Sequence, residues 1–332
     1  MNIYVFGVLF ILIFYVVVGT YVGKKVKNIE DYYVAGRNAP TLFIVGTLVA
    51  SYLSSVAFMG EVGFSYDGYV IAFLILFVIA SLGYYIGGRY FGRYLRRAES
   101  LTIPEFFGQR YNSKRIQLLT SITSVIGIGC YLVAVTQGGA ILVQELLGTG
   151  YFVSLIITCL AYMPFCFYSG SKGVILTDTI MFIIFTAMAI ISVPYIVQYA
   201  GGWPDAIINT VLSEVKPGAL AWHGVITGPN AYMGTAIDVL VWGIVLGLVW
   251  LVVISVSPWQ ASRFLMAKDE HTVLRSGLIS PVLLLIVCTF LHFAVTTINA
   301  VDPYISPSER VYISTALTQF PTWLGIFVCG GI

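Results

Sequence analysis

The sequence predicts an all-α polytopic membrane protein, and three observations lead to this prediction. Of the 332 residues, 58% are hydrophobic and only 10% are charged, whereas soluble domains contain roughly 45–50% apolar and about 25% charged residues. A soluble fold of this length cannot bury so much apolar surface, so the hydrocarbon core of a bilayer must solvate it. Apolar runs long enough to cross a bilayer recur along the whole chain. This composition excludes a soluble enzyme, a secreted disulfide scaffold, a coiled coil and a disordered protein.

Eight complete membrane spans are predicted, and a ninth begins near the end of the sequence. The complete spans cover residues 3–23, 41–65, 70–90, 118–146, 151–168, 174–199, 237–258 and 276–298, and the ninth starts near residue 319 and runs to Ile332. The first span is expected to stay in the mature protein, because it lacks the basic leading segment and the A-x-A cleavage site of a signal peptide.

Two of the connections between spans are more than turns. The segment 89–117 is amphipathic, and residues 101–107 within it predict a short interfacial helix with Pro104 in its first turn. Residues 200–236 form the long loop at the other side of the membrane. Neither connection has the composition of an independent domain, so we expect a single transmembrane domain.

The basic residues predict the orientation of the chain. Short cytoplasmic loops collect Lys and Arg, and the loops after the first, third, fifth and seventh spans contain all of the 17 basic residues except Lys216 and Arg310. The N-terminus is therefore expected outside the cell.

The second span carries polar side chains at the depth of the membrane. Ser51, Ser54, Phe58 and Glu61 are spaced 3, 4 and 3 residues apart, which would place them on one face of a helix. Facing lipid, Glu61 would cost several kcal/mol, so this face is expected to meet protein or a water-filled cavity.

The centre of the same span is a weak helix, because serines and Tyr52 interrupt it and glycines flank Glu61. A helix that unwinds there exposes backbone carbonyls, and these, with Ser and Thr hydroxyls, are oxygen ligands that suit a sodium ion. Alternatively, Ser51, Ser54 and Ser55 are small packing residues that bond to their own helix. The spacing alone does not separate the two interpretations.

Two further polar residues lie at membrane depth. Asp178 lies one turn inside the sixth span, where it is either a waypoint for a cation or a helix N-terminal acid that pairs with Lys172. Gln137 lies deep in the fourth span and either lines a cavity or bonds to another helix. The sequence contains no HExxH, P-loop, GxSxG or Ser/His/Asp arrangement, and its cysteines are scattered singly. We therefore expect neither an enzyme nor a bound cofactor.

Several stretches resemble the sodium:solute symporter family, which includes bacterial proline, pantothenate, acetate and sialic acid carriers and sodium/glucose cotransporters. The stretches are DYYVAGR at 31–37, ASYLS at 50–54 with Gly60 and Gly63, TIPEF at 102–106 with RYN at 110–112, Thr177-Asp178, and the looser RFLMAK at 263–268. Each motif is loose, but their order and spacing match the family along essentially the whole chain.

The resemblance implies a LeuT-type architecture, in which an extra N-terminal helix (1–26) precedes two inverted five-helix repeats. The first repeat would be 41–199, the external loop 200–236, and the second repeat, 237–332, would be incomplete. The sequence is thus expected to be a fragment or one part of a split carrier, with a missing C-terminal half as its partner.

The resemblance also assigns site residues. The backbone carbonyls of Ala50 and Leu53 would bind sodium, and Asp178 would lie on the ion path. The residues expected to border the solute are Ser51, Tyr52, Ser54, Ala57, Phe58 and Trp250, to which we add Gln137 from its position in the fourth span.

The implied function is sodium-coupled symport of a small organic solute, by alternating access, in a bacterial inner membrane. Proline carriers have Asp at the position of Tyr52, and sugar carriers have Gln at Ala57 and Tyr at Val253, so an organic acid or amino acid is favoured. Two alternatives remain open. One is a transporter-like sensor domain of a signalling kinase, and the other is a proton-coupled carrier that uses Glu61 or Asp178.

Overall fold

The computed structural model describes residues 3–228 and 231–331, although the side chains of residues 164–169 are not described. Within these ranges the protein is helical throughout and contains no β-strand, and a single parallel bridge joins Ala39 to Ala267. Ile332, where the ninth predicted span ends, lies outside the described residues, as do residues 229–230 of the long loop.

Six of the described helical segments are long and apolar enough to cross a membrane. They are Ile3–Gly23, Val56–Ala98, Lys114–Leu147, Gly170–Tyr199, Ala236–Leu265 and Glu270–Ala300. Shorter apolar helices accompany them at Thr41–Tyr52, Tyr151–Met163 and Thr322–Gly331. The protein is therefore an integral membrane protein, as its composition predicts.

The helices follow the predicted order. They are α1 (Ile3–Gly23), α2 (Ile29–Val34), α3 (Thr41–Tyr52), α4 (Val62–Phe64), α5 (Val70–Ile86), α6 (Arg93–Ala98), α7 (Ile103–Arg110), α8 (Lys114–Leu147), α9 (Tyr151–Tyr199), α10 (Trp203–Val211), α11 (Ala236–Val256), α12 (Pro258–Leu265), α13 (Glu270–Thr296), α14 (Val311–Gln319) and α15 (Thr322–Gly331). Wider π-helical turns occur at Val56–Glu61, Ser65–Tyr69 and Gly87–Gly92, and 3₁₀ turns at Ala35–Arg37, Thr297–Ala300 and Ser308–Arg310.

Four predicted spans differ from the helices that form. The second span, 41–65, is broken after α3. The fifth and sixth spans are one helix, α9, kinked at Gly170, whose φ of +53° suits glycine because it has no Cβ. The seventh span ends at Val256, and Pro258 then opens α12, since proline fits the first turn of a helix.

The interfacial helix predicted near residue 103 is α7. The Thr102 side chain accepts a hydrogen bond from the Glu105 N–H at 3.2 Å, and the Glu105 carboxylate accepts one from the Leu101 N–H at 2.7 Å. Together these two bonds satisfy backbone donors at the start of the helix, with Pro104 in the first turn.

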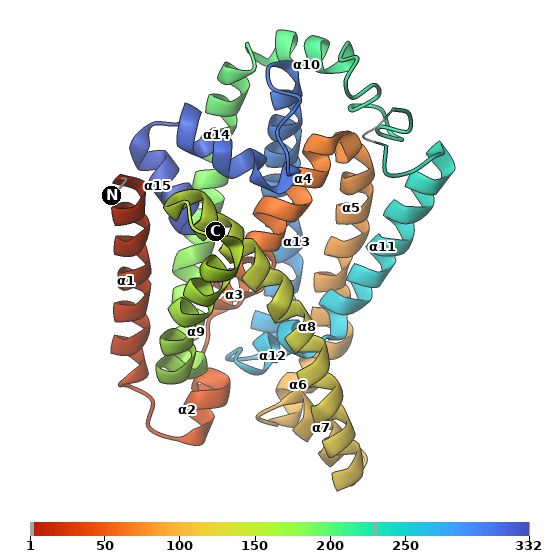
Figure 1. Ribbon diagram of the computed structural model, residues 1–332. Coiled ribbons are helices and arrows are strands. Elements are labelled where there is room, and N and C mark those ends of the chain that lie inside the picture. Colours follow the sequence, from red (N-terminus) through yellow and green to blue (C-terminus); the bar gives the residue numbers. More distant parts are fainter. Residues whose placement is uncertain (1–2, 229–230, 332) are drawn as a thin grey trace.

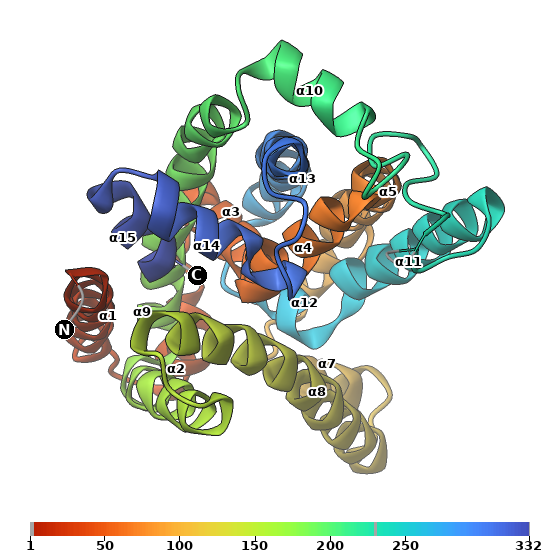
Figure 2. The same ribbon diagram turned by 45° about the horizontal axis from the view of Figure 1, so that its top comes forward.

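Helix α13 lies in the middle of the bundle, in contact with α3, α5 and α9 (Figures 1 and 2). Helix α11 packs along α5, while α1 packs at the edge against α9 and α15. Large side chains such as Phe77, Tyr84 and Leu48 are fully buried in the centre. The core therefore forms where the second and third predicted spans meet α13.

Most basic residues gather at one end of the bundle, which we call the basic end and which carries α2, α6, α7 and α12 (Figure 1). At this end, ion pairs connect α6 to the start of α13. Arg93 and Arg97 of α6 both bind Glu270 of α13, at 2.9 and 2.8 Å. The Arg96 Nε also donates to the Ala267 carbonyl at 2.5 Å. The opposite end carries α10.

Candidate functional site

The site is built around the break that ends α3. Leu53 leaves the helical conformation (φ −70°, ψ +70°), and the Ser54 N–H bonds to the Tyr52 carbonyl at 2.7 Å. Winding resumes as the π-helix Val56–Glu61. Ala50 and Leu53 lie where the last carbonyls of a helix lose their regular partners. The predicted unwinding of the second span is confirmed.

The single polar face that the 3-4-3 spacing predicts for residues 51–61 is wrong, because the helix breaks within it. The Ser51 hydroxyl donates to the carbonyl of Thr47, one turn earlier, at 2.6 Å. Ser54 and Ser55 instead contact α8, where the Ser55 hydroxyl donates to a backbone carbonyl at 2.9 Å. Ser51 therefore bonds to its own helix, whereas Ser54 and Ser55 connect the broken segment to α8.

Asp178 joins three elements at this break. Its carboxylate accepts a hydrogen bond from the Thr47 hydroxyl of α3 at 2.5 Å. The Arg263 guanidinium of α12 lies 3.7 Å from the same carboxylate and donates to the Ser51 hydroxyl at 3.1 Å. The Arg263 Nε is buried and has no hydrogen-bond partner among the described residues. The negative charge of Asp178 is thus balanced by a cation that belongs to the protein.

The alternative in which Asp178 is a helix N-terminal acid paired with Lys172 is wrong. Asp178 lies two turns beyond the kink at Gly170, inside α9, and Lys172 pairs with Asp31 at 3.0 Å. The Lys172 hydrogen bond holds the pKa of the Asp31 carboxyl below its usual range. Lys172 therefore fastens α2 to α9 at the basic end.

Glu61 lies beside Tyr52 in a mainly aromatic environment. The Tyr52 hydroxyl donates to one Glu61 carboxylate oxygen at 3.1 Å. The other oxygen, Oε2, is buried without a hydrogen-bond partner in the described part of the chain. The Tyr52 ring packs edge-on against Phe77 and Trp250, with ring centroids 5.5 and 5.8 Å apart. Tyr52 and Trp250, both predicted to border the solute, are in contact.

The other predicted solute residues are not part of this contact. Phe58 is buried and stacks on Tyr312 of α14 at 5.9 Å, with Phe185 of α9 at 5.5 Å. Ala57 is also buried. Gln137 lies exposed on α8, and no hydrogen bond to it is found among the described residues, so we remove it from the candidate site.

A cavity of about 440 Å³ lies between α8 and the end of α11. Trp250 of α11 and Tyr131 of α8 line it, and Tyr131 stacks on Trp259 at 4.8 Å. The Tyr131 hydroxyl also donates to the Ser51 carbonyl at 3.3 Å. The same two aromatic residues therefore border both the cavity and the α3 break.

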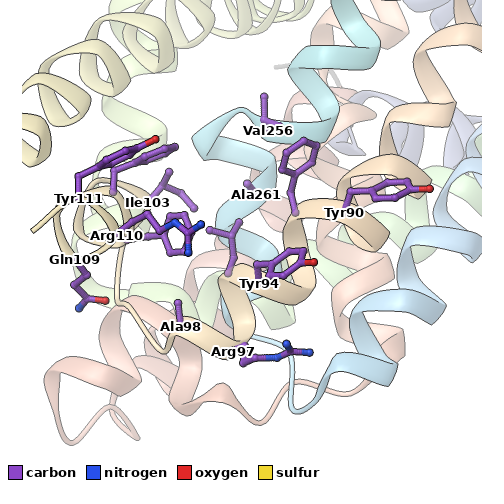
Figure 3. A pocket seen from close by; sticks show the side chains of 14 residues that line it. Tyr90, Tyr94, Arg97, Ala98, Ile103, Gln109, Arg110, Tyr111, Val256 and Ala261 are labelled. Atoms are coloured by element: carbon purple, nitrogen blue, oxygen red, sulfur yellow. The ribbon is translucent and has the colours of Figure 1, made fainter.

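A larger hollow of about 1000 Å³ opens beside this cavity at the basic end. Figure 3 shows Tyr94 and Arg110 approaching each other across it from α6 and α7. Both cavities are lined by Ile103, Phe107 and Val256. They form adjoining spaces that lead from the basic end toward Trp250.

At the opposite end, two ion pairs hold the connections in place. Lys216 of the long loop is buried, lies 3.6 Å from Asp67, and places its ammonium 3.4 Å from the centre of the Tyr66 ring. Burial lowers the pKa of Lys216 to about 8, although Asp67 acts against this shift. Glu145 of α8 pairs with Arg310 at 2.8 Å. Both basic residues that fall outside the basic end are thus paired.

The sequence predicted Glu61 as a coupling residue only under the proton-coupled alternative, and it did not predict Arg263 as a site residue. For Glu61, the signal was a carboxylate at membrane depth, which the sequence already shows. For Arg263, the sequence showed only that it begins the loosely matching stretch 263–268, because its position between Ser51 and Asp178 depends on how α12 packs.

Comparison with known proteins gives the site its context. A sequence model of the sodium:solute symporter family matches residues 32–329. A sodium/pantothenate symporter of Haemophilus influenzae is 26% identical over 92% of this chain and 62% of its own length. A sodium/glucose cotransporter of Vibrio parahaemolyticus is 28% identical over 53% of this chain and 32% of its own. This chain thus spans about three fifths of the pantothenate relative.

The fold has a solved counterpart. The structure of a Na⁺-coupled sialic acid symporter superposes with a TM-score of 0.79 at 16% sequence identity, and the match covers 100% of this chain and 70% of the other. The predicted LeuT-type fold is confirmed, and the relatives are transporters rather than enzymes. The family match covers nearly the whole chain, so this protein belongs to the sodium:solute symporter family.

Proposed function

We propose that the protein carries out sodium-coupled symport of a small organic solute by alternating access. The observation that supports this proposal best is the break in α3 next to the Asp178 network. Broken helices in secondary transporters offer backbone carbonyls to a coupling ion. In this proposal the carbonyls of Ala50 and Leu53 bind sodium, and Asp178 lies on the path that the ion follows.

The proposed topology follows from the distribution of basic residues. The basic end would face the cytoplasm of a bacterial cell, with the N-terminus outside, because cytoplasmic loops retain Lys and Arg. Helix α1 would precede a first repeat over residues 41–199, and residues 237–332 would belong to the second repeat. Residues 200–236 would form the external loop.

The proposed solute is an organic acid or an amino acid. Tyr52, Ala57 and Val253 replace the polar groups that the family uses for proline and sugars, and the relative from Haemophilus influenzae, which matches most of this chain, carries pantothenate. The proposed lining residues are Ser51, Tyr52, Ser54, Ala57, Phe58 and Trp250. A membrane potential would add about 2.3 kcal/mol per charge per 100 mV, enough for roughly fifty-fold accumulation.

Uptake by reconstituted protein tests the proposal. Proteoliposomes would receive a labelled panel of monocarboxylates and amino acids, with an inward sodium gradient or with potassium in place of sodium. We expect uptake only with sodium, and loss of the sodium dependence in Asp178→Asn. The matched control is Asp205→Asn, which changes an exposed residue of α10. Uptake that is indifferent to sodium in the wild-type protein would contradict symport.

A second candidate is proton coupling, which the unpaired Glu61 oxygen favours. Under that mechanism a pH gradient alone would drive uptake, and Glu61→Gln would abolish it. Solute binding without transport under any gradient would instead favour the sensor interpretation.

A further inference from the structure

Glu61 differs from the other carboxylates that lie near the membrane-spanning helices. Asp178 lies near Arg263, Glu145 near Arg310 and Asp67 near Lys216, each within 4.0 Å. In the part of the chain that the structure describes, no Lys, Arg or His forms an ion pair with Glu61. Among the described residues its only side-chain hydrogen bond comes from the Tyr52 hydroxyl, and Oε2 has none.

An unpaired carboxylate in this position is costly for the protein. Removing an ion from water costs several kcal/mol unless an opposite charge or several donors compensate it. Among the described residues the protein supplies only one donor to this carboxylate, the phenol of Tyr52. The charged form of Glu61 is therefore favoured when a cationic ligand binds it, and without a ligand a proton can neutralise it.

The surroundings of Glu61 suit an organic ammonium better than a sodium ion. A sodium ion is held by several oxygen ligands, whereas the one side chain that bonds to Glu61 is the phenol of Tyr52. The Tyr52 ring packs against Phe77 and against Trp250, and Tyr84 and Cys288 are close enough to Glu61 to interact electrostatically. A carboxylate beside aromatic rings matches an ammonium group, which donates N–H bonds and is attracted to ring faces.

The adjoining cavities lead to within one side chain of this position. Trp250, which contacts Tyr52, lines the cavity of about 440 Å³, and that cavity borders the larger hollow at the basic end. Trp250 separates this cavity from Tyr52, whose hydroxyl bonds to Glu61, so a side-chain movement of Trp250 would bring an amine to the pair. Glu61 also ends the π-helix Val56–Glu61, and such turns frequently occur at functional sites.

We propose that Glu61 and Tyr52 form an ammonium subsite, so that the transported solute carries a protonated amine. The inference rests on the proposed transport function and narrows its solute class, favouring a zwitterionic amino acid over an acid without an amine. The Glu61 Oε2 atom accepts an N–H bond from the ammonium, while Tyr52 holds the other oxygen in place.

Matched ligand pairs test the subsite. Isothermal titration of the purified chain in sodium buffer would compare alanine with lactate and valine with 2-hydroxyisovalerate, since the members of each pair differ in their ammonium and hydroxyl groups. We expect the amine-bearing member to bind at least about tenfold more tightly. Glu61→Gln should remove this preference. The matched control Glu214→Gln, which changes an exposed carboxylate outside the membrane helices, should keep it.

Failure of the subsite and failure of symport give different results. Equal or tighter binding of the hydroxy acids, or no binding of either amino acid, would overturn the ammonium subsite. The same would follow if Glu61→Gln kept the amine preference. Symport is judged separately, by whether sodium raises the thermal stability of the chain above its value in potassium, a readout that needs no solute.

Discussion

Two membrane-depth carboxylates, Asp178 and Glu61, lie near the α3 break in opposite electrostatic situations. Asp178 has an arginine 3.7 Å away and a threonine hydroxyl bonded to it, whereas Glu61 has one phenol and an unpaired oxygen. The difference indicates two roles. The charge of Asp178 is balanced within the protein, so a cation that reaches it must compete with Arg263. The charge of Glu61 has no counter-charge among the described residues, and in our proposal the solute supplies it.

Arg263 links the proposed ion path to the packing of α12 at the basic end. Arg263 belongs to α12 and reaches both Ser51 of α3 and Asp178 of α9. A sodium ion at Asp178 would weaken the hold of Arg263 on these two helices. We therefore expect ion binding to loosen the contact of α12 with α3.

Removing Arg263 should have the largest effect on stability. Arg263→Met leaves Asp178 buried with only the Thr47 hydroxyl, and we expect the free energy of unfolding to fall by about 3 kcal/mol, the lower end for a buried pair because both side chains are partly accessible. Chemical denaturation in mild detergent would measure the loss.

The double variant Arg263→Met with Asp178→Asn serves as the control for this prediction. Because it removes both charges, it should recover most of the stability. If the single and double variants are equally unstable, the ion pair is not the cause, and the loss comes from the packing of α12.

Glu61→Gln should change stability in the opposite direction. The amide still accepts the Tyr52 hydrogen bond but carries no charge, so the ligand-free protein should gain about 1 kcal/mol. The same denaturation experiment measures the gain. Asp178→Asn provides the comparison, because it leaves Arg263 without its counter-charge and should destabilise the protein. A loss of stability in Glu61→Gln would mean that a cation already pairs with Glu61.

How far the sequence predicts this structure depends on how local each feature is. Apolar runs predict α1, α8 and α13 because the length and hydrophobicity that a membrane-spanning helix needs depend on its own residues. Thr102 and Pro104 predict the start of α7 because capping is also local.

The site is less predictable, because its partners come from distant parts of the chain. Asp178 pairs with Arg263 rather than with the nearby Lys172, and Gln137 is exposed on α8. The kink at Gly170 and the packing of α12 decide these contacts, and no spacing pattern encodes them. The contact between Tyr52 and Trp250 agrees with the prediction that both border the solute. That prediction came from the resemblance to the family, which implies a tertiary arrangement, and not from the spacing of the residues.

The smallest expected effect concerns the long loop and its pH dependence. With the loop packed on the bundle, the pKa of Lys216 is about 8, which is below the usual value for lysine. When the loop opens, Lys216 is exposed to water and its pKa returns to the usual value. At pH values between these two pKa values, the open loop therefore binds more protons than the closed loop. Raising the pH through this window should therefore favour the closed loop. Amide hydrogen exchange of residues 213–218, corrected for the intrinsic pH dependence, should slow. Lys216→Met should remove this change, and faster exchange at high pH in the wild-type protein would refute the assignment.

The division of roles between the two carboxylates is tested most directly by measuring alanine and lactate binding, with and without sodium, in Asp178→Asn and Glu61→Gln. We predict that Asp178→Asn loses the sodium dependence and keeps the preference for alanine, while Glu61→Gln loses the preference and keeps the sodium dependence. If both variants lose the same property, or if each loses the property assigned to the other, the account is contradicted.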